Sequence, residues 1–194
     1  MSVILEKTLD RVLVELESLP LGLRDHINRT RTLAKELSSI HGADALSSDL
    51  AAAAHDLYRH WSAKSLLEKS VSESIQVDDI EACEPILLHG AAASNWLYHY
   101  ANCQDRQVLD AVRYHTTGRP GMTVVEKVLF IADKVEPDKV VREENLSKVL
   151  DLAYSNLDKA IEEYLSWRIQ RILSDGGLIH PLSIDTWNYQ MKNT

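Results

Sequence analysis

The sequence predicts an all-α protein, because apolar residues recur at helical spacing along almost the whole chain and no stretch of useful length alternates as a β-strand would. Proline, glycine and short polar segments separate the periodic stretches, as they do in a bundle of packed helices. The 194 residues fit one domain with a substantial core and contain no internal repeat or low-complexity tract. We therefore expect one helical domain over residues 1–194.

Two amphipathic helices are predicted at the N-terminus. Residues 3–19 place leucine, isoleucine and valine on one face between acids and bases, and Pro20 follows them. Residues 24–42 repeat this pattern and close at Gly42, the expected C-terminal cap. His26 therefore falls in the first turn of the second helix.

The next predicted helix is an alanine-rich run over residues 44–58. Its composition gives high helix propensity, and its small side chains let neighbouring helices approach closely. His55 and Asp56 lie near its end. Residues 62–70 favour another short helix, and the polar segment after them is expected to form a loop.

Three more helices are predicted in the middle of the chain. A buried one lies within residues 86–101 and opens near His89, and a second covers residues 105–115. After the loop TTGRPGM, a third helix runs over residues 123–135, with Thr123 as its N-cap. Pro137 is expected to end it.

The C-terminal third is predicted to be helical over residues 144–177, with a break near Asn156 and a stop at the two glycines. The tail, residues 178–194, contains Pro181, Trp187 and Tyr189, so it is too apolar for a solvated end. We expect it to pack on the domain.

The composition excludes several functional classes. A net charge of −8 argues against a nucleic-acid surface and against a polybasic membrane anchor. The N-terminal segment mixes charges into its apolar positions, so it indicates neither a signal peptide nor a spanning helix, and we expect a cytoplasmic protein. Cys83 and Cys103 have no metal-ligand or redox spacing and are expected to be ordinary reduced residues.

Histidines and aspartates at or near the ends of separate predicted helices are the main functional signal. Asp133 stands out because it lies in the apolar run VLFIAD, where an unpaired carboxylate would be costly to ionise. A metal cation is the simplest partner. Mixed imidazole and carboxylate ligands suit iron, manganese, cobalt or zinc, whereas an oxygen-only set would indicate magnesium or calcium. The candidate residues are His26, His55, Asp56, His89, His115 and Asp133.

The remaining histidines have a simpler interpretation. A single histidine in a helix is more often a core or surface residue than a ligand. We interpret His41, His60 and His99 in this way. His180 receives the same interpretation, although it differs from the other three because it lies in the apolar tail.

The order of these residues resembles that in the HD-domain metal phosphohydrolases. The segment RYHTTGRPGMTVVEKVLFIADKVEP closely resembles their YqeK-type branch, the symmetrical diadenosine tetraphosphate hydrolases. The resemblance covers most of the chain and is strongest over residues 110–137, clear at AAAAHDLYR and ILLHGAAA, and weaker in the first helix and the C-terminal third. It implies an HD-domain core at about residues 23–140, with C-terminal helices and tail over 141–194 packed on it.

The resemblance implies roles for the six candidates. Asp56 is expected to be catalytic as well as a ligand. His89 and His115 are left with two roles, as ligands of a second metal or as catalytic groups that contact the substrate phosphates, and we favour phosphate contact. Members of the family bind iron, which agrees with the mixed ligand set, while manganese and cobalt are alternatives. The implied metal ligands are His26, His55, Asp56 and Asp133.

Substrate contacts are implied as well. Arg59 stands where the family usually has lysine, and Lys139 where it often has arginine, so both positions keep a positive charge for phosphate. Thr116 is a candidate hydrogen-bond donor to phosphate. The tail falls where the family packs residues against the nucleotide, and the corresponding residues are Ile179, His180, Pro181, Leu182, Ser183 and Ile184.

Two positions depart from the family pattern. Leu23 stands where an arginine is common, with Arg24 one residue later, and Lys134 replaces an aromatic residue. We expect neither departure to touch a proposed ligand, so the metal site is expected to be intact. Substrate preference is the property that these departures affect.

The implied activity is that of a symmetrical bis(5'-nucleosyl)-tetraphosphatase, which converts diadenosine tetraphosphate into two ADP. One alternative is another HD-type nucleotide phosphohydrolase, such as a nucleotidase or phosphodiesterase. The other is a non-catalytic, nucleotide-binding HD module. The expected partner is a small-molecule nucleotide, with no nucleic acid and no membrane; a homodimer is left open.

Overall fold

The structure is a computed structural model that describes residues 2–193. That part of the chain contains helices and no β-strand, which confirms the all-α prediction. The elements are α1 (Ser2–Leu16), α2 (Leu21–His41), α3 (Ala45–Ala54), α4 (Ala63–Ser72), α5 (Asp79–Cys83), the 3₁₀ helix η1 (Pro85–Leu88), α6 (His89–His99), α7 (Arg106–Tyr114), α8 (Val124–Val135), α9 (Pro137–Arg142), α10 (Leu146–Ala153), α11 (Leu157–Ser174) and α12 (Pro181–Asn193).

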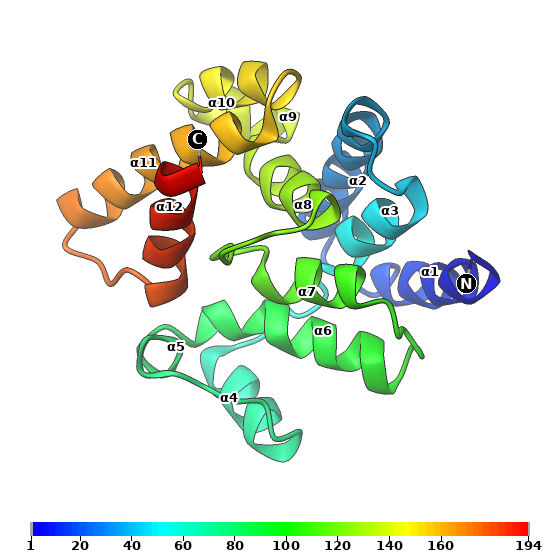
Figure 1. The fold of residues 1–194 in the computed structure, drawn as a ribbon. Helices are drawn as coiled ribbons and strands as arrows, with labels where there is room; N and C mark the ends of the chain where they lie inside the picture. The colour runs from blue at the N-terminus through cyan, green and yellow to red at the C-terminus, as the bar shows by residue number, and fades with distance from the viewer. Residues whose placement is uncertain (1, 194) are drawn as a thin grey trace.

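Five helices, α2, α3, α6, α7 and α8, pack against one another and form the centre of the molecule. Figure 1 shows the remaining helices around them. Helix α1 lies beside α3. Helices α4 and α5 lie next to η1 and α6, and α10 to α12 lie on the side of α8. The first and last thirds of the chain therefore both reach the central helices.

Helix α8 is buried along most of its length. Phe130 and Ile131 are fully buried, as are Leu129 and Val128, so this helix is apolar almost all round. Burial of each large apolar side chain stabilises the fold by about 1.5–3 kcal/mol. A rigid α8 is the support on which Asp133, near its C-terminus, is held.

Most of the predicted helix boundaries are confirmed. Thr123 caps α8 and forms a capping box with Glu126. Gly42 follows α2 in the left-handed conformation, with φ of 68°. Asn156 separates α10 from α11 and accepts a hydrogen bond from the Lys159 N–H, as an N-cap does.

The predicted end of the alanine-rich helix is wrong. Helix α3 ends at Ala54, and residues 55–61 form turns and a bend. The Ala52 carbonyl accepts a hydrogen bond from the ring Nδ1 of His55 at 2.7 Å, so the side chain takes an acceptor that a continuing helix would use. This early stop turns His55 and Asp56 into the centre of the protein.

Three short elements were not predicted. Helix α5 has a capping box from Asp78 and Glu81, and η1 starts at Pro85. Pro137 follows the end of α8 as predicted, yet it also begins α9, because proline is well suited to the first turn of a helix, where its missing N–H is not needed.

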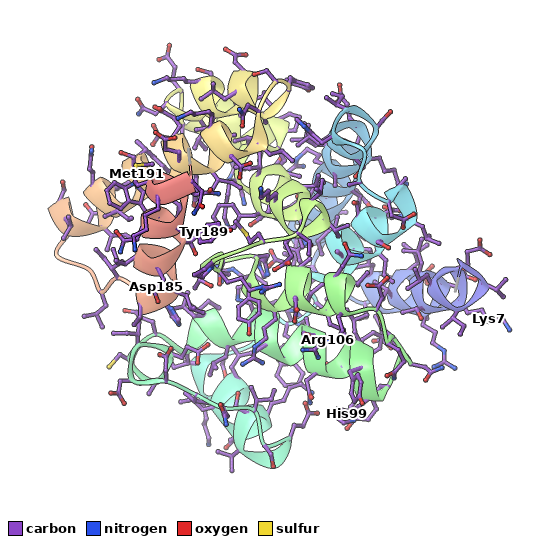
Figure 2. The ribbon with its side chains drawn as sticks, viewed as in Figure 1. Lys7, His99, Arg106, Asp185, Tyr189 and Met191 are labelled. Atoms are coloured by element: carbon purple, nitrogen blue, oxygen red, sulfur yellow. The ribbon has the colours of Figure 1, made fainter. Side chains whose placement is uncertain are left out.

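The tail forms α12, which packs against α11. Trp187 packs on the main core, and Thr186 and Gln190 are buried, which confirms that the tail is not a solvated end. Figure 2 labels Tyr189 and Met191 on the same helix, and both are exposed. The apolar content of the tail is therefore only partly used in packing.

Candidate metal centre

The six residues singled out in the sequence converge on one place. His26 lies on α2, His55 and Asp56 follow α3, and Asp133 lies near the end of α8. His89 opens α6, and His115 caps the end of α7. These side chains are at most 12% exposed, and they meet where the five central helices pack together.

The first half of the cluster contains His26, His55 and Asp133. His26 Nε2 lies 3.1 Å from Asp133 Oδ1, and His55 Nε2 lies 3.6 Å from the same oxygen. Asp56 Oδ2 completes this half, at 3.5 Å from His26 Nε2 and 3.6 Å from His55 Nε2. Two imidazole nitrogens and two carboxylate oxygens therefore surround one position.

The second half contains His89 and His115 around the other oxygen of Asp56. Asp56 Oδ1 lies 3.0 Å from His89 Nε2 and 3.5 Å from His115 Nε2. The two ring nitrogens are 3.0 Å apart. Asp56 thus turns one carboxylate oxygen toward each half, as a ligand shared by two cations would.

The ring hydrogen bonds determine which nitrogen of each histidine can bind a cation. Nδ1 of His55 and Nδ1 of His115 contact the main-chain carbonyls of Ala52 and Val112, and a carbonyl can only accept, so each Nδ1 carries the proton. His89 Nδ1 contacts the Ile86 carbonyl in the same way.

His26 Nδ1 faces the carboxylate of Glu136 at 3.2 Å, which also only accepts. In the neutral rings all four Nε2 atoms therefore present lone pairs to the cluster. Lone pairs that face one another repel, whereas a divalent cation between them would bind them. The donor set fits a divalent metal.

The electrostatics of the cluster keep its acids ionised. Burial raises the pKa of Asp56, but the charge of His55 and hydrogen bonds from His115 and His89, when those rings carry a proton on Nε2, outweigh burial and hold that pKa well below its usual value. Burial likewise raises the pKa of Asp133, and the ammonium groups of Lys134 and Lys139 lower it by more. Both carboxylates are available to a cation at neutral pH.

His115 is neutral at the same pH. Burial is the main cause that lowers its pKa to about 4. Its Nε2 therefore offers a lone pair rather than a positive charge.

Two lysines contact Asp133. Lys139 Nζ lies 2.8 Å from Oδ1 and donates to the Asp133 main-chain carbonyl at 2.6 Å. Lys134 Nζ lies 2.6 Å from Oδ2, so the expectation that this departure touches no ligand is wrong. The ammonium of Lys134 also lies over the rings of Phe130 and Tyr164, so the Lys134 side chain folds back along α8 toward Phe130. Oδ1 therefore faces the histidines and Lys139, and Oδ2 is paired with Lys134.

The other predicted substrate residues lie in different parts of the structure. Arg59 is exposed in the turn after Asp56. Thr116, directly after His115, lines a cavity of about 320 Å³ between η1, α11 and the start of α12, together with His180 and Ser183. Leu182 lines an adjoining cavity of about 250 Å³. The lining of these two cavities does not include Ile179, Pro181 or Ile184.

The simpler interpretation of the other histidines agrees with their positions. His41 Nε2 bonds the Ala153 carbonyl at 2.6 Å, and His60 is exposed. His99 is exposed at the end of α6, at the edge of the molecule in Figure 2. His180 Nδ1 accepts from the Leu182 N–H, so its Nε2 carries the proton and donates to Asp78 Oδ2 at 2.9 Å, an arrangement that leaves no lone pair for a metal.

Three functional candidates were missed in the sequence. Glu136 is buried and bonds His26, Arg29 bonds Glu136, and Arg168 lines the larger cavity. The spacing of His26 and Arg29, three residues apart on α2, places both on one face and was the available signal for the first pair. Arg168 carries no comparable signal, because α11 was recognisable only as an amphipathic helix.

Gly90 allows α6 and α7 to approach closely beside His115. A methyl group at this position would lie 2.8 Å from the Val112 carbonyl oxygen and 3.1 Å from His115 Nδ1, the two atoms that bond each other. We expect Gly90→Ala to lower the free energy of unfolding by about 1–3 kcal/mol and to weaken metal binding. Urea unfolding and metal titration would measure these changes.

Gly22→Ala is the matched control for that substitution. Gly22 is also helical, and a methyl group there would meet nothing within 4 Å. Its stability should be unchanged or slightly higher, since alanine has the higher helix propensity. Equal effects of the two substitutions would show that close packing at Gly90 is unimportant.

Known proteins resemble this chain over most of its length. It is 32% identical over 155 residues to the symmetrical bis(5'-nucleosyl)-tetraphosphatase of Halalkalibacterium halodurans, which covers 80% of this chain and 81% of that protein. The chain belongs to the symmetrical bis(5'-nucleosyl)-tetraphosphatase family. The protein of the same name from Bacillus subtilis is 30% identical over 161 residues, or 83% of this chain and 85% of that protein.

The tetraphosphatase family membership confirms the resemblance found in the sequence. No protein-family model matches the chain. A crystal structure from Clostridium acetobutylicum, described as a predicted HD superfamily hydrolase involved in NAD metabolism, has a TM-score of 0.90 and 26% identity, covering 95% of this chain and 97% of that one. This similarity confirms that the chain has the helical fold of the HD superfamily.

Within residues 2–193 no helix is both long enough and apolar enough to cross a bilayer.

Proposed function

We propose that this protein hydrolyses symmetrical dinucleoside tetraphosphates and converts diadenosine tetraphosphate into two ADP. The convergence of four inward-facing Nε2 atoms and two ionised aspartates supports this proposal, in a chain whose relatives are named for that activity. A buried set of this kind is costly to assemble without a cation to bind, so we assign it to metal-assisted phosphoryl chemistry.

The first metal is assigned to His26, His55, Asp56 and Asp133. A divalent metal bound there would lower the pKa of a water molecule and neutralise phosphoryl charge. Two nitrogen and two oxygen donors suit iron, and manganese or cobalt would accept the same ligands. Metal analysis of the purified protein identifies which of them is bound.

For His89 and His115 we infer the first of the two roles that the sequence left open, that of ligands of a second metal. Phosphate contact needs a proton on Nε2, whereas the hydrogen bonds of both rings leave a lone pair there. A second metal on these two nitrogens and on Asp56 Oδ1 is therefore better supported than direct contact with phosphate. Asp56 would then bridge the two metals.

This assignment predicts a metal stoichiometry. Two metal ions per chain are expected in the wild-type protein, and His115→Ala should retain one of them, because the first half of the cluster does not depend on that ring. Hydrolysis should fall by about 10²–10³-fold. Metal analysis after dialysis, with kinetics on the same samples, would check both values. One ion per chain in both the wild-type protein and His115→Ala would instead favour phosphate contact.

The reaction needs one water molecule. Its oxygen attacks one of the two central phosphorus atoms, the bond from that phosphorus to the central bridging oxygen breaks, and one ADP leaves with the bridging oxygen. We assign Asp56, whose two oxygens face the two histidine pairs, to holding and orienting groups, and the attacking water gives up its proton to solvent as the two ADP form. Lys139 and Arg59 would offset charge on the phosphate chain.

The larger cavity is assigned to one nucleoside of the substrate. It begins at Thr116, beside His115, and runs between apolar side chains such as Ile86 and Ile169. Arg168 and His180 add polar groups to its wall. A cavity with both apolar walls and several polar groups suits a nucleobase and its ribose.

Incubation with diadenosine tetraphosphate and separation of the products tests the proposed function. Two ADP are expected. AMP plus ATP, or activity on monophosphates alone, would instead indicate another HD-type phosphohydrolase. Nucleotide binding without phosphate release would indicate a binding module.

We also infer that residues 1–194 form one domain, because α10 and α11 pack on α8 and the tail packs on α11. The proposed partner is a free nucleotide in the cytoplasm, since the net charge of −8 does not favour nucleic acid.

A further inference from the structure

The four histidines of the metal centre are held by two different kinds of outer partner. His55, His89 and His115 each donate from Nδ1 to the main-chain carbonyl three residues earlier, at Ala52, Ile86 and Val112. His26 lies inside α2, where the neighbouring carbonyls serve the helix, and its Nδ1 instead faces the carboxylate of Glu136 at 3.2 Å. Among the four rings, only His26 has a charged side chain as its outer partner.

Glu136 is itself held on both oxygens. It lies in the bend between α8 and α9 and is 1% exposed. Arg29 donates from Nε to Oε2 at 2.6 Å, with a second nitrogen 3.3 Å from Oε1, and the Asp138 N–H donates to Oε2 at 2.9 Å. A buried carboxylate with these donors is fixed in position and ionised.

We propose that Glu136 and Arg29 form a positioning pair that orients His26 and strengthens its Nε2 as a metal ligand. The proposal rests on the metal site assigned under the proposed function. A carboxylate that accepts the outer N–H of a ligating imidazole fixes its tautomer and ring orientation and raises its basicity, more than a neutral carbonyl does. The metal held by His26 would therefore depend on a side chain that does not touch it.

The position of Arg29 agrees with this role. It follows His26 by three residues, so α2 presents the ligand and the cation on one face. Its side chain is 34% exposed, so it joins the buried carboxylate to the surface without being buried itself. The three other histidines have no equivalent side-chain pair, because the outer partner of each is a main-chain carbonyl. Substitution of a side chain does not remove such a partner.

Glu136→Gln tests the proposal, since it keeps the volume and one acceptor but removes the charge. Cobalt(II) affinity, measured by competition with a chromophoric chelator, should fall roughly 10–100-fold for the ion on the His26 side. The visible spectrum of the bound cobalt should change as well. Hydrolysis should recover when the metal concentration is raised, because the ligands themselves are intact.

Glu126→Gln is the matched control. Glu126 is 2% exposed, its oxygens accept two bonds from Arg119 at 2.6 and 2.7 Å, and it accepts the Thr123 N–H at 2.9 Å. It therefore shares the burial, the arginine partner and the capping role of Glu136, yet no histidine of the metal centre is among its partners. Its cobalt affinity and spectrum should equal those of the wild-type protein.

Equal losses in the two glutamine variants would overturn the proposal, because the effect would then be structural, and so would an unchanged affinity in Glu136→Gln. If Glu136→Gln does not fold, Arg29→Gln decides, with a weaker loss in the same direction expected and no loss contradicting us. A wild-type protein that binds cobalt without hydrolysing diadenosine tetraphosphate would overturn the proposed function alone.

Discussion

Asp56→Asn is expected to abolish hydrolysis, with a loss of more than about 10³-fold, and to empty both halves of the metal centre. Asp56 is the residue whose two oxygens face different histidine pairs, at 3.5–3.6 Å on one side and 3.0–3.5 Å on the other. Asparagine keeps the shape but removes the negative charge and replaces one donor oxygen with an amide nitrogen. Metal analysis and product formation should therefore fall together.

Asp49→Asn serves as the control for this substitution. Asp49 is 5% exposed and is held by Arg31 and Lys35, so it is another buried, paired aspartate, but these two partners are not ligands of the centre. It should keep metal and activity even if its stability falls. Retention of both metal ions in Asp56→Asn would contradict the shared-ligand assignment.

Asp133→Ala should lose activity to a similar extent, more than about 10³-fold, but lose metal only from the His26 side. Asp133 Oδ1 lies 3.1 Å from His26 Nε2 and 3.6 Å from His55 Nε2, both in the first half of the cluster. The variant should remain helical, because the fully buried residues Phe130 and Ile131 of the same helix are unchanged. Metal counts, circular dichroism and kinetics on one preparation would test this.

Lys134 and Lys139 contact Asp133, so substitutions of Asp133 also test the balance of charge at the metal centre. Removal of Asp133 leaves Lys134 and Lys139 without their shared carboxylate, so two ammonium groups would remain beside an incomplete ligand set. Asp133→Asn restores the shape but not the charge, and should also fail to hold the first metal. Full metal content in either variant would show that Asp133 is not a ligand.

The sequence predicted the fold class and the helix order because the chain marks its helices with periodic apolar residues, caps and prolines. It placed the end of α3 at Tyr58, too late, since helix propensity does not report that a histidine ring will take the Ala52 carbonyl. The short helices α5 and α9 were missed for a similar reason, because a few residues carry too little periodicity.

The site was predictable in its ligands and less so in their surroundings. His26, His55, Asp56 and Asp133 were found because the order of the histidines and aspartates matched a family and because Asp133 lies in an apolar run. Glu136 was hidden within a long acidic and basic segment, and Arg29 looked like any surface arginine of an amphipathic helix. Outer partners depend on how helices meet, which is a three-dimensional property.

Main-chain carbonyls at two helix ends position two of the candidate ligands, so the site depends on the backbone there. Ala52 and Val112 belong to the last turns of α3 and α7, the parts of a helix that fray most readily, and their carbonyls hold His55 and His115. Fraying by one turn would release a ring before the core around Phe130 opened. Thermal inactivation can therefore precede global unfolding, with the loss of two helix ends as its first step.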